Sequence, residues 1–324
     1  MKKLLIAALL LCVNQTLAQT PTIEAKDFKL EVPALNLPLE PMQQAAFDAA
    51  IKRRAFTEAE TILINAAQGE YARDKKSARA AQLYEAVGGV FFLNQEFLNA
   101  AISFKRADAA VPLQARNRFT LAMSYLRLNR RDWAKPELER LTKEHPTNAL
   151  YLYWLARLDY DAKAYNEAIA KLTKVVALDP TMMRAHDSLG LCYDYLGKYD
   201  EAVNHYRRAL ELNAKQTPPS AWPHVNLAIT LLAQNKVAEA ESELRAALRL
   251  NAQVPQAHYQ LGLALDKLNR PTEAIAALED AARLDASYAE PHYSLGQLYK
   301  KQGDSAKSQA AMAKFQTLKA AQKK

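Results

Sequence analysis

From residue 81 onwards, apolar positions recur with helical spacing in a block that repeats along the chain. The segments 185–213 and 257–285 align without a gap and place apolar and small residues at the same offsets. Extending the alignment in both directions gives seven units, which start at residues 81, 115, 149, 183, 221, 255 and 289. The step is 34 residues, except for 38 where Thr217–Ser220 add a proline-rich insertion. A repeat of this length predicts stacked copies of one supersecondary unit.

Each unit contains two amphipathic segments. In the first, positions 7, 8 and 11 of the unit hold residues such as Leu189, Gly190 and Tyr193, whose spacing places them on one face of a helix. The second segment carries alanine at position 20 in most units and a large apolar residue at position 24, for example Ala202 and Tyr206. Asparagine or glycine at position 15 in most units predicts a turn between the two helices. Each unit is therefore expected to be a helix hairpin.

These residues resemble the pattern of the tetratricopeptide repeat family, W-x2-L-G-x2-Y, then A-x3-F, then P. The resemblance covers residues 81–322, and a weaker unit begins at residue 40. Asp159 departs from the pattern because it stands at an aromatic position. The resemblance implies an all-α fold, a right-handed superhelical solenoid of stacked helix hairpins, each of which buries its faces against its neighbours.

The first residues have the basic, apolar and polar parts of a secretory signal peptide. Lys2 and Lys3 precede the apolar run Leu4–Val13, and cleavage is expected after Ala18. The run is about half as long as a membrane-spanning helix requires. We therefore expect an exported protein in the periplasm of a Gram-negative bacterium, with secretion as an alternative.

The chain has two cysteines, of which only one would remain after cleavage. Cys12 closes the apolar run, but Leu11 stands where a bacterial lipoprotein signal carries a small residue, so lipidation is a minor alternative. Cys192 cannot form an internal disulfide and lies in an apolar helical pattern, where a buried, unreactive thiol is usual.

Residues 19–39 are rich in proline and apolar side chains and are expected to be extended. They would form an N-terminal arm that either remains flexible or docks on the solenoid or on a partner. The expected domain organisation is a signal peptide at 1–18, this arm at 19–39, a divergent hairpin at 40–80 and the seven units at 81–324. The last helix would close the array with a polar face.

The charge is concentrated at the C-terminal end. Losing Lys2 and Lys3 lowers the formal charge from +8 to +6, and residues 300–324 carry that excess, which leaves the rest nearly neutral. Because no basic stripe runs along the protein, nucleic acid is not expected as a partner. The lysine-rich C-terminal helix leaves a weak possibility of contact with an anionic surface.

Motifs that carry catalysis are absent from the chain. It has no G-x-S-x-G, H-E-x-x-H, phosphate-binding loop or dinucleotide fingerprint. The repeats extend to residue 322 of the 324 residues, so no catalytic domain is expected beside them. We therefore expect no enzyme activity and no cofactor.

Four histidines share position 4 of their units, namely His186, His224, His258 and His292. They recur one repeat apart, so neighbours should be separated by at least a helix-packing distance of about 8–10 Å. Zinc binds nitrogen ligands at about 2.0–2.1 Å. These histidines are therefore expected to pack between helices, and no metal site is predicted.

The inner face of the superhelix is expected to carry the function. In the family, positions 2, 5, 9, 12 and 13 of each first helix line this face, and here they mix aromatic, arginine and acidic residues suited to an extended peptide. The residues selected for the groove are Phe119, Met123, Arg127, Tyr153, Arg157, Arg184, Asp187, Asp194, Tyr259 and Tyr293. Alternatively, the charges on this face only pair across adjacent repeats. Positions 5 and 9 are expected to lie outside the core, so alanine at Tyr153 and Arg157 should preserve helix content.

The sequence thus predicts an exported, non-catalytic scaffold or adaptor that holds protein or peptide partners in its groove. Some family members clamp a C-terminal carboxylate with lysine at position 5 and asparagine at position 9, and no unit here has that pair. The alternative function is a periplasmic holdase-type chaperone or assembly factor for exported clients.

Overall fold

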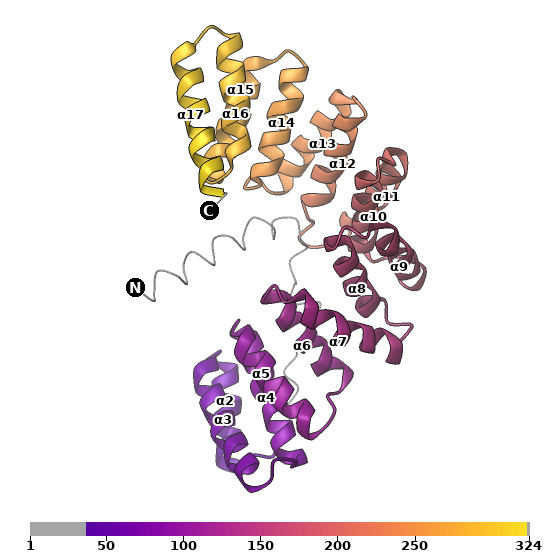
Figure 1. Cartoon of the computed structure of the whole chain (residues 1–324), viewed down its shortest axis with the longest axis vertical. Helices are drawn as coiled ribbons and strands as arrows, with labels where there is room; N and C mark the ends of the chain where they lie inside the picture. Colours follow the sequence, from indigo (N-terminus) through magenta and orange to yellow (C-terminus); the bar gives the residue numbers. More distant parts are fainter. Residues whose placement is uncertain (1–36, 323–324) are drawn as a thin grey trace. The chain divides into compact units, whose positions relative to one another are not determined.

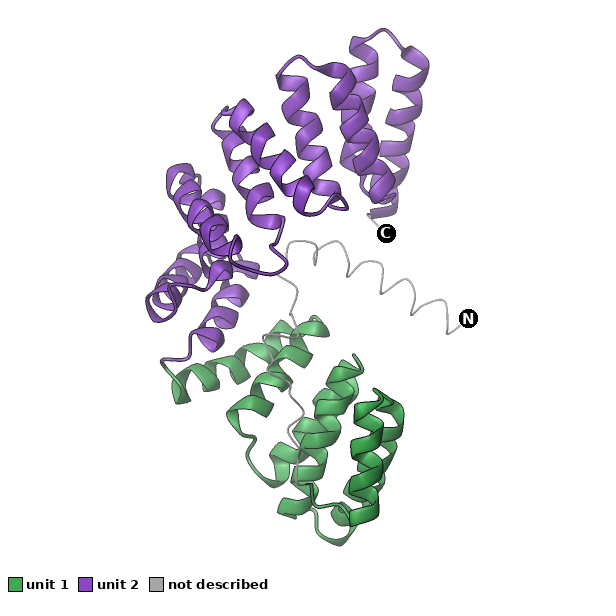
Figure 2. Ribbon diagram, turned by 180° about the vertical axis from the view of Figure 1, so that it is seen from behind, with its two compact units in different colours: residues 1–146 green, residues 147–324 purple. Residues whose placement is uncertain are grey.

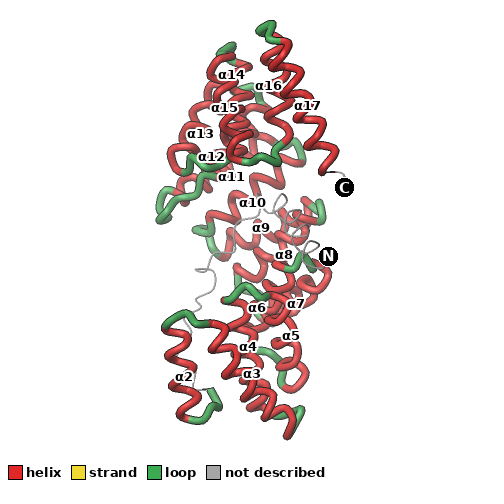
Figure 3. Tube along the Cα trace, turned by 90° about the vertical axis from the view of Figure 1, so that its left-hand side faces the viewer, coloured by secondary structure: helices red, strands yellow, loops and turns green. Residues whose placement is uncertain are grey.

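The computed structural model describes residues 37–322, and every regular element in that part of the chain is an α-helix (Figure 3). The predicted fold class is confirmed. The expected signal peptide and most of the expected arm lie outside the described residues. In chain order the helices are α2 (Pro41–Lys52), α3 (Phe56–Arg73), α4 (Ala78–Leu93), α5 (Phe97–Ala110), α6 (Ala115–Arg127), α7 (Arg131–Glu144), α8 (Ala149–Asp161), α9 (Tyr165–Leu178), α10 (Met183–Tyr195), α11 (Tyr199–Asn213), α12 (Trp222–Ala233), α13 (Val237–Leu250), α14 (Pro255–Lys267), α15 (Pro271–Leu284), α16 (Ala289–Lys301) and α17 (Ser305–Gln322).

The helices form two compact units (Figure 2). Unit 1 ends at Pro146 and contains α2–α7, and unit 2 begins at Thr147 and contains α8–α17. Within each unit every helix packs against the helices before and after it in the chain (Figure 1). First helices also touch the next first helix, as α8 touches α10 and α10 touches α12. Each described helix is too short or too polar to cross a membrane.

The turn inside each hairpin has one recurring geometry. A residue with positive φ stands at position 15 of every unit and of the weaker unit before them: Arg54, Gln95, Asn129, Lys163, Gly197, Asn235, Asn269 and Gly303. The next amide donates to the carbonyl five residues earlier, as from Ala164 to Asp159 at 2.8 Å. This bond pattern is the usual end of a helix that closes with a left-handed residue. Gln95 and Lys163 adopt it without being asparagine or glycine.

The core of each hairpin depends on a small residue at position 8 facing a large one at position 24. In the α10–α11 hairpin, a methyl group on Gly190 would lie 2.5 Å from the ring of Tyr206, which is buried. Where position 8 is alanine, as at Ala122 and Ala156, the alanine is fully buried. The close approach of the two helices therefore excludes any larger side chain at Gly190.

A side-chain bridge closes the four-residue insertion between α11 and α12. The amide of Asn213 donates to the carbonyl of Ser220 at 2.7 Å, and the backbone N–H of Ser220 donates to the Asn213 side-chain oxygen at 2.8 Å. Asn213 is buried, so these two bonds satisfy its polar atoms. The longer loop is absorbed without disturbing the stacking of α11 on α12.

Candidate functional site

Arginine and tyrosine side chains alternate along α8 and α10 in unit 2. The guanidinium carbon of Arg157 lies 4.6 Å from the ring centroid of Tyr160, and that of Arg184 lies 5.3 Å from the ring centroid of Tyr153. Such cation–π contacts hold a guanidinium flat against a ring. We call Tyr153, Arg157, Tyr160, Tyr165, Arg184 and Tyr195 the arginine–tyrosine cluster.

The three outer tyrosines of this cluster pack on one another. The rings of Tyr165 and Tyr195 are stacked with centroids 5.0 Å apart, and Tyr160 meets both rings edge-on at 5.7 and 5.8 Å. Tyr195 is nevertheless 57% exposed. An aromatic ring that is held in place by neighbours yet open to solvent offers contact area at a low entropic cost.

Arg157 is the most unusual residue of the cluster. Its side chain is only 5% exposed, and its Nη2 atom lies 3.7 Å from the Asp161 carboxylate. Its Nη1 atom is buried and has no hydrogen-bond partner among residues 37–322. A buried donor on a charged group costs free energy when it is left unmade. The position therefore favours any carboxylate or carbonyl oxygen that can reach it.

Asp187 and Asp194 of α10 bond to the next first helix. Asn226 of α12 donates to both carboxylate oxygens of Asp187 at 3.0 and 3.3 Å, and Thr230 donates to Asp194 at 2.8 Å. Burial raises the pKa of both carboxyls, to about 6 for Asp187. These two groove candidates thus hold adjacent repeats together through hydrogen bonds from neutral side chains, which differs from the charge pairing across repeats that the sequence left open.

The remaining candidates lie on other helices. Phe119 and Met123 of α6 are buried, whereas Arg127 is exposed with its guanidinium carbon 4.9 Å from the ring centroid of Phe97. Tyr259 of α14 is half-buried beside Tyr288, with ring centroids 5.3 Å apart. Tyr293 of α16 is exposed beside Phe315. Within unit 2, the structure therefore brings together four of the predicted residues, Tyr153, Arg157, Arg184 and Asp187.

One expectation about this face is wrong. Tyr153 has no exposed surface and Arg157 has almost none, so positions 5 and 9 of α8 belong to the core between helices. Their side chains pack against α10 as well as facing the groove positions. Replacing Tyr153 by alanine would leave a cavity and cost about 3–5 kcal/mol, as aromatic truncations in cores do.

Tyr165 was not among the residues selected from the sequence. It is the first residue of α9 and stands outside the inner-face positions of a first helix. Phe97 and Tyr199 begin the second helices of two other units, so an aromatic residue at this position gave no distinctive signal. The stacking of Tyr165 on Tyr195 depends on how two hairpins meet, which no local pattern states.

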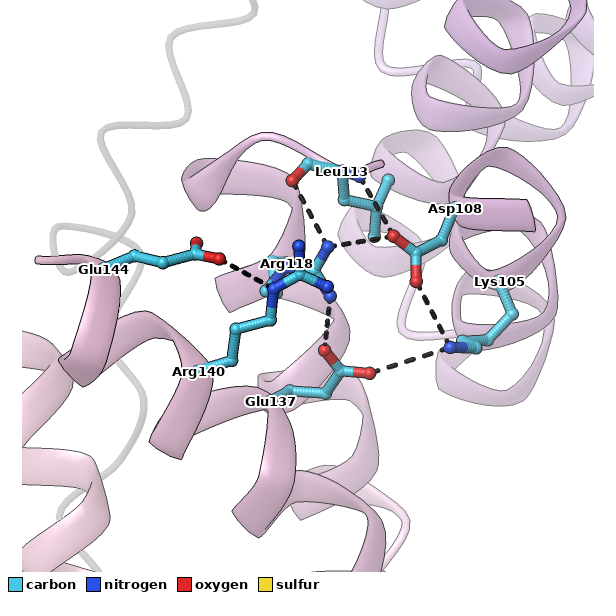
Figure 4. Close-up of polar contacts among 7 residues, drawn as sticks. All are labelled: Lys105, Asp108, Leu113, Arg118, Glu137, Arg140 and Glu144. Atoms are coloured by element: carbon cyan, nitrogen blue, oxygen red, sulfur yellow. Dashed lines mark hydrogen bonds and ion pairs between the residues drawn. The ribbon is translucent and has the colours of Figure 1, made fainter. Parts of the chain in front are cut away.

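A second cluster of charged residues lies in unit 1 and is structural (Figure 4). Arg118, at position 4 of its unit, is 1% exposed and donates to Asp108 at 2.9 Å and to Glu137 at 2.7 Å. Lys105 lies 3.3 Å from Asp108 and 3.7 Å from Glu137. The network ties α5, α6 and α7 together and pairs each charged group of the cluster, although the buried Nε atom of Arg118 has no hydrogen-bond partner among the described residues.

The position-4 histidines also face their own hairpin. Position 4 of the first helix lies opposite position 23 of the second, so His224 contacts Glu243 at 2.6 Å just as Arg118 contacts Glu137. Within the described part of the chain, no three histidine, cysteine or acidic side chains stand close enough to hold a metal ion together. Cys192 is fully buried, and burial raises the pKa of its thiol to about 12.

Three of the five described lysines from residue 300 onwards form ion pairs. Lys301 pairs with Asp266 at 3.0 Å, Lys307 with Asp304 at 3.5 Å, and Lys319 with Glu290 at 2.5 Å. These pairs reduce the charge that α16 and α17 present to an anionic surface.

Comparison with known proteins agrees with the repeat pattern. Family models described as tetratricopeptide repeat match residues 119–182, 188–216, 225–289 and 289–322. Among curated proteins, the chain is 30% identical over 140 residues to the uncharacterized protein y4yS of Sinorhizobium fredii, which covers 43% of this chain and 74% of that protein. It is 38% identical over 69 residues to human RANBP2-like and GRIP domain-containing protein 1, of which the chain spans 4%.

Two solved structures share the fold over most of their length. PilW, titled a type IV pilus biogenesis factor, superposes with a TM-score of 0.58 at 18% identity and covers 63% of this chain and 92% of its own. PilF of Pseudomonas aeruginosa superposes with a TM-score of 0.55 at 20% identity and covers 64% and 96%. At such identities the likeness concerns the fold alone. With its matched repeats, its hairpin geometry and these relatives, the chain belongs to the tetratricopeptide repeat family.

Proposed function

We propose that this protein is an exported, non-catalytic scaffold that holds protein or peptide partners, and that the arginine–tyrosine cluster of unit 2 is its main contact. The observation that carries the proposal is Arg157, a buried guanidinium with an unused donor that packs on the ring of Tyr160, which in turn meets the exposed ring of Tyr195. Hot spots of protein interfaces combine an arginine and aromatic rings in this way.

An extended peptide suits the chemistry of this cluster. Its carboxylates and backbone carbonyls would accept hydrogen bonds from Arg157, whose Nη1 lacks a partner but is covered by neighbouring side chains until a partner displaces them. Its apolar side chains would cover Tyr195 and Tyr165, whose stacked rings need no rearrangement. The stacked rings are already in place in the free protein, so this part of the contact requires little ordering, whereas a partner reaches Arg157 Nη1 only when the side chains around it move.

The absence of catalysis is part of the proposal. The cluster holds no activated nucleophile, and the thiol nearest to it, Cys192, is buried with its pKa raised by burial. A neutral, enclosed thiol is a poor nucleophile. The tyrosines act through their rings, and burial raises the pKa of Tyr160 far above neutrality.

Export rests on the first residues of the chain. The basic start, the short apolar run and Ala18 favour cleavage and a periplasmic or secreted location. N-terminal sequencing of the mature protein from envelope fractions tests this directly, with a new N-terminus at Gln19 as the expected result. A protein that keeps Met1 in the cytoplasm would end the periplasmic interpretation.

The binding surface can be tested with a matched pair of tyrosine substitutions. Tyr195→Ala removes the exposed ring of the cluster, whereas Tyr199→Ala removes a ring that is 37% exposed at the start of the next helix and outside the cluster. We expect Tyr195→Ala to lower the recovery of crosslinked envelope partners by about 30-fold. This factor corresponds to a loss of about 2 kcal/mol of binding free energy, as for a hot-spot residue. Arg157→Lys should act in the same direction because lysine lacks the planar fork.

The controls separate the possible outcomes. Tyr199→Ala should recover partners as the wild type does, and circular dichroism should be the same for all variants. Equal recovery by Tyr195→Ala and Tyr199→Ala would place the contact elsewhere, with the segment 19–39 as the next candidate.

The fold shared with the pilus biogenesis factor PilW favours a second candidate, an assembly factor or holdase for exported clients. Suppression of aggregation of several unrelated unfolded proteins would support it, whereas selective capture of one or two partners would support the scaffold.

A further inference from the structure

Two histidines face each other across the α10–α11 hairpin. His186 occupies position 4 and His205 occupies position 23, and their Nδ1 atoms are 3.4 Å apart. The ring centroids are 5.7 Å apart and the rings are tilted by 30°. Both side chains are partly exposed. This pairing could not be inferred from the histidines at position 4, because His205 stands outside that series.

The separation of the two nitrogen atoms matches that of two ligands of one metal ion. Nitrogens that each lie about 2.0–2.1 Å from a tetrahedral zinc ion stand about 3.3–3.4 Å apart. The rings now point at each other and share a hydrogen bond, and a small rotation about each Cβ–Cγ bond would turn both lone pairs toward one point. The open side of the pair would leave the remaining coordination positions to water.

Neighbouring groups hold both rings in place. Tyr193 stacks on His205, with centroids 5.4 Å apart and planes within 6°. His186 also forms a hydrogen bond with the Pro180 carbonyl. Partners of this kind orient histidine ligands in known metal sites. Burial lowers the pKa of both rings, which keeps them in the neutral form that binds metal.

Two charged groups act on His186 in opposite directions. Arg208 would repel a cation, but it is held by Glu211 at 2.7 Å, and the Glu211 carboxylate acts on His186 in the opposite direction. No other described hairpin places two histidines together. The other histidines at position 4 are His224, His258 and His292, and position 23 of their units holds Glu243, Ala277 and Ala311. Where position 4 is Arg118, position 23 is Glu137.

We propose that His186 and His205 form a two-histidine site for a divalent first-row ion that prefers imidazole, such as Zn²⁺ or Cu²⁺, with water completing its coordination. The affinity should follow the general order of these ions, so Cu²⁺ should bind more tightly than Zn²⁺. Because α10 and α11 meet at this pair, a bound ion would crosslink the two helices and stabilise the hairpin. The proposal does not depend on the scaffold function.

The test is isothermal titration calorimetry, in which Zn²⁺ is added to the tag-free, EDTA-treated full chain. The Zn²⁺ affinity of the wild type is compared with that of His205→Gln and of His292→Gln. His292 also stands at position 4, but Ala311 occupies its position 23. We expect the wild type and His292→Gln to bind one ion per chain. His205→Gln should bind Zn²⁺ more weakly by more than about tenfold, because even residues that only orient metal ligands change the affinity by that much. Thermal unfolding without metal verifies that each variant is folded.

A second readout is the shift of the unfolding temperature on adding Zn²⁺ or Cu²⁺. It should be positive for the wild type and absent for both His205→Gln and His186→Gln. Failure of the wild type to bind Zn²⁺, or equal binding by wild type and His205→Gln, would overturn the proposal and leave the pair as a hydrogen bond between neutral rings.

Discussion

Gly190 shows how a single missing side chain sets the distance between two helices. A methyl group there would meet two ring carbons of Tyr206 at 2.5 and 2.6 Å, and that ring cannot move away because it is buried. Gly89 of α4 is the opposite case, since a methyl group at Gly89 would meet nothing within 4 Å.

We therefore predict opposite effects for one substitution at these two glycines. Gly190→Ala should destabilise by about 1–3 kcal/mol because it overpacks the core, and Gly190→Trp should cost more. Gly89→Ala should stabilise by about 0.5–1 kcal/mol because it only removes backbone freedom. Denaturant unfolding of both variants measures this, and stabilisation by Gly190→Ala would show that the two helices are not in contact at this point.

Asp187 contributes to the free energy of unfolding in a way that depends on pH, and the direction of its pKa shift gives the sign. Burial raises its pKa to about 6, above the about 3.9 of an unfolded aspartate. Asp187 therefore loses its proton more readily in the unfolded state than in the folded state. Its contribution to stability is fully present below about pH 3.9 and is lost as the pH rises through the pKa of the folded state. The loss is at most about 3 kcal/mol, the equivalent of two pKa units.

Asp187→Asn should remove this dependence. Asparagine still offers an oxygen to Asn226, so the variant should match the wild type at pH 4 and become progressively more stable than it up to about pH 6.5. Urea unfolding across this pH range provides the measurement. A difference between the two proteins that does not change with pH would show that Asp187 ionises normally.

At the scale of elements, the Arg118 network decides how α5, α6 and α7 pack in unit 1 (Figure 4). Burial alone would raise the pKa of Asp108, but the hydrogen bond from the Leu113 amide and the charge of Arg118 hold it below its ordinary value. Asp108 therefore stays ionised, and it depends on the guanidinium for compensation.

Arg118→Met should destabilise unit 1 by about 3–5 kcal/mol because it leaves Asp108 and Glu137 buried without their main partner. The pair's contribution is present above the ordinary aspartate pKa and is lost as pH falls through the depressed folded pKa, so the cost should shrink in acid. Thermal unfolding at pH 7 and pH 3 compares the two. Asp132→Asn, at an exposed site of α7, serves as the control and should change little.

The hairpin turns contain a position where a substitution should increase stability. Lys163 has φ of 62°, a conformation that costs a residue with a Cβ about 1 kcal/mol or more. Lys163→Gly should therefore stabilise by a few tenths to about 1 kcal/mol, and Lys198→Gly, one residue past the equivalent turn residue, should not. The denaturant midpoints of the two variants and of the wild type measure these differences. Destabilisation by Lys163→Gly would contradict the left-handed backbone at this turn.

At the scale of the whole molecule, stability is expected to be spread along neighbouring repeats. Each helix packs mainly on the helices adjacent to it in the chain, so a local defect should be felt most by its nearest neighbours.

Hydrogen exchange of Gly190→Ala should show this spread. Amide protection should fall most in α10 and α11, less in α9 and α12, and hardly at all in α16 and α17, because coupling passes from one repeat to the next. Uniform loss of protection through α8–α17 would instead indicate that unit 2 unfolds as one cooperative block.

The sequence by itself determined the class of the fold and the register of its hairpins. Periodicity and the alternation of small and large residues are local properties, and repetition made them unambiguous, so α6, α8, α10, α14 and α16 begin at the residues where the units start. Seven copies also reveal the positions that build the core, because a chance pattern would not recur at one spacing.

Contacts between helices were decided only by the tertiary structure. Nothing local states that Tyr153 is enclosed, that Tyr165 stacks on Tyr195, or that His186 meets His205. Even the left-handed backbone of Lys163 follows from its place in the hairpin and not from its side chain. The physical reason is that burial and pairing depend on residues far apart in the chain, whereas a sequence pattern reports only on the helix in which it lies.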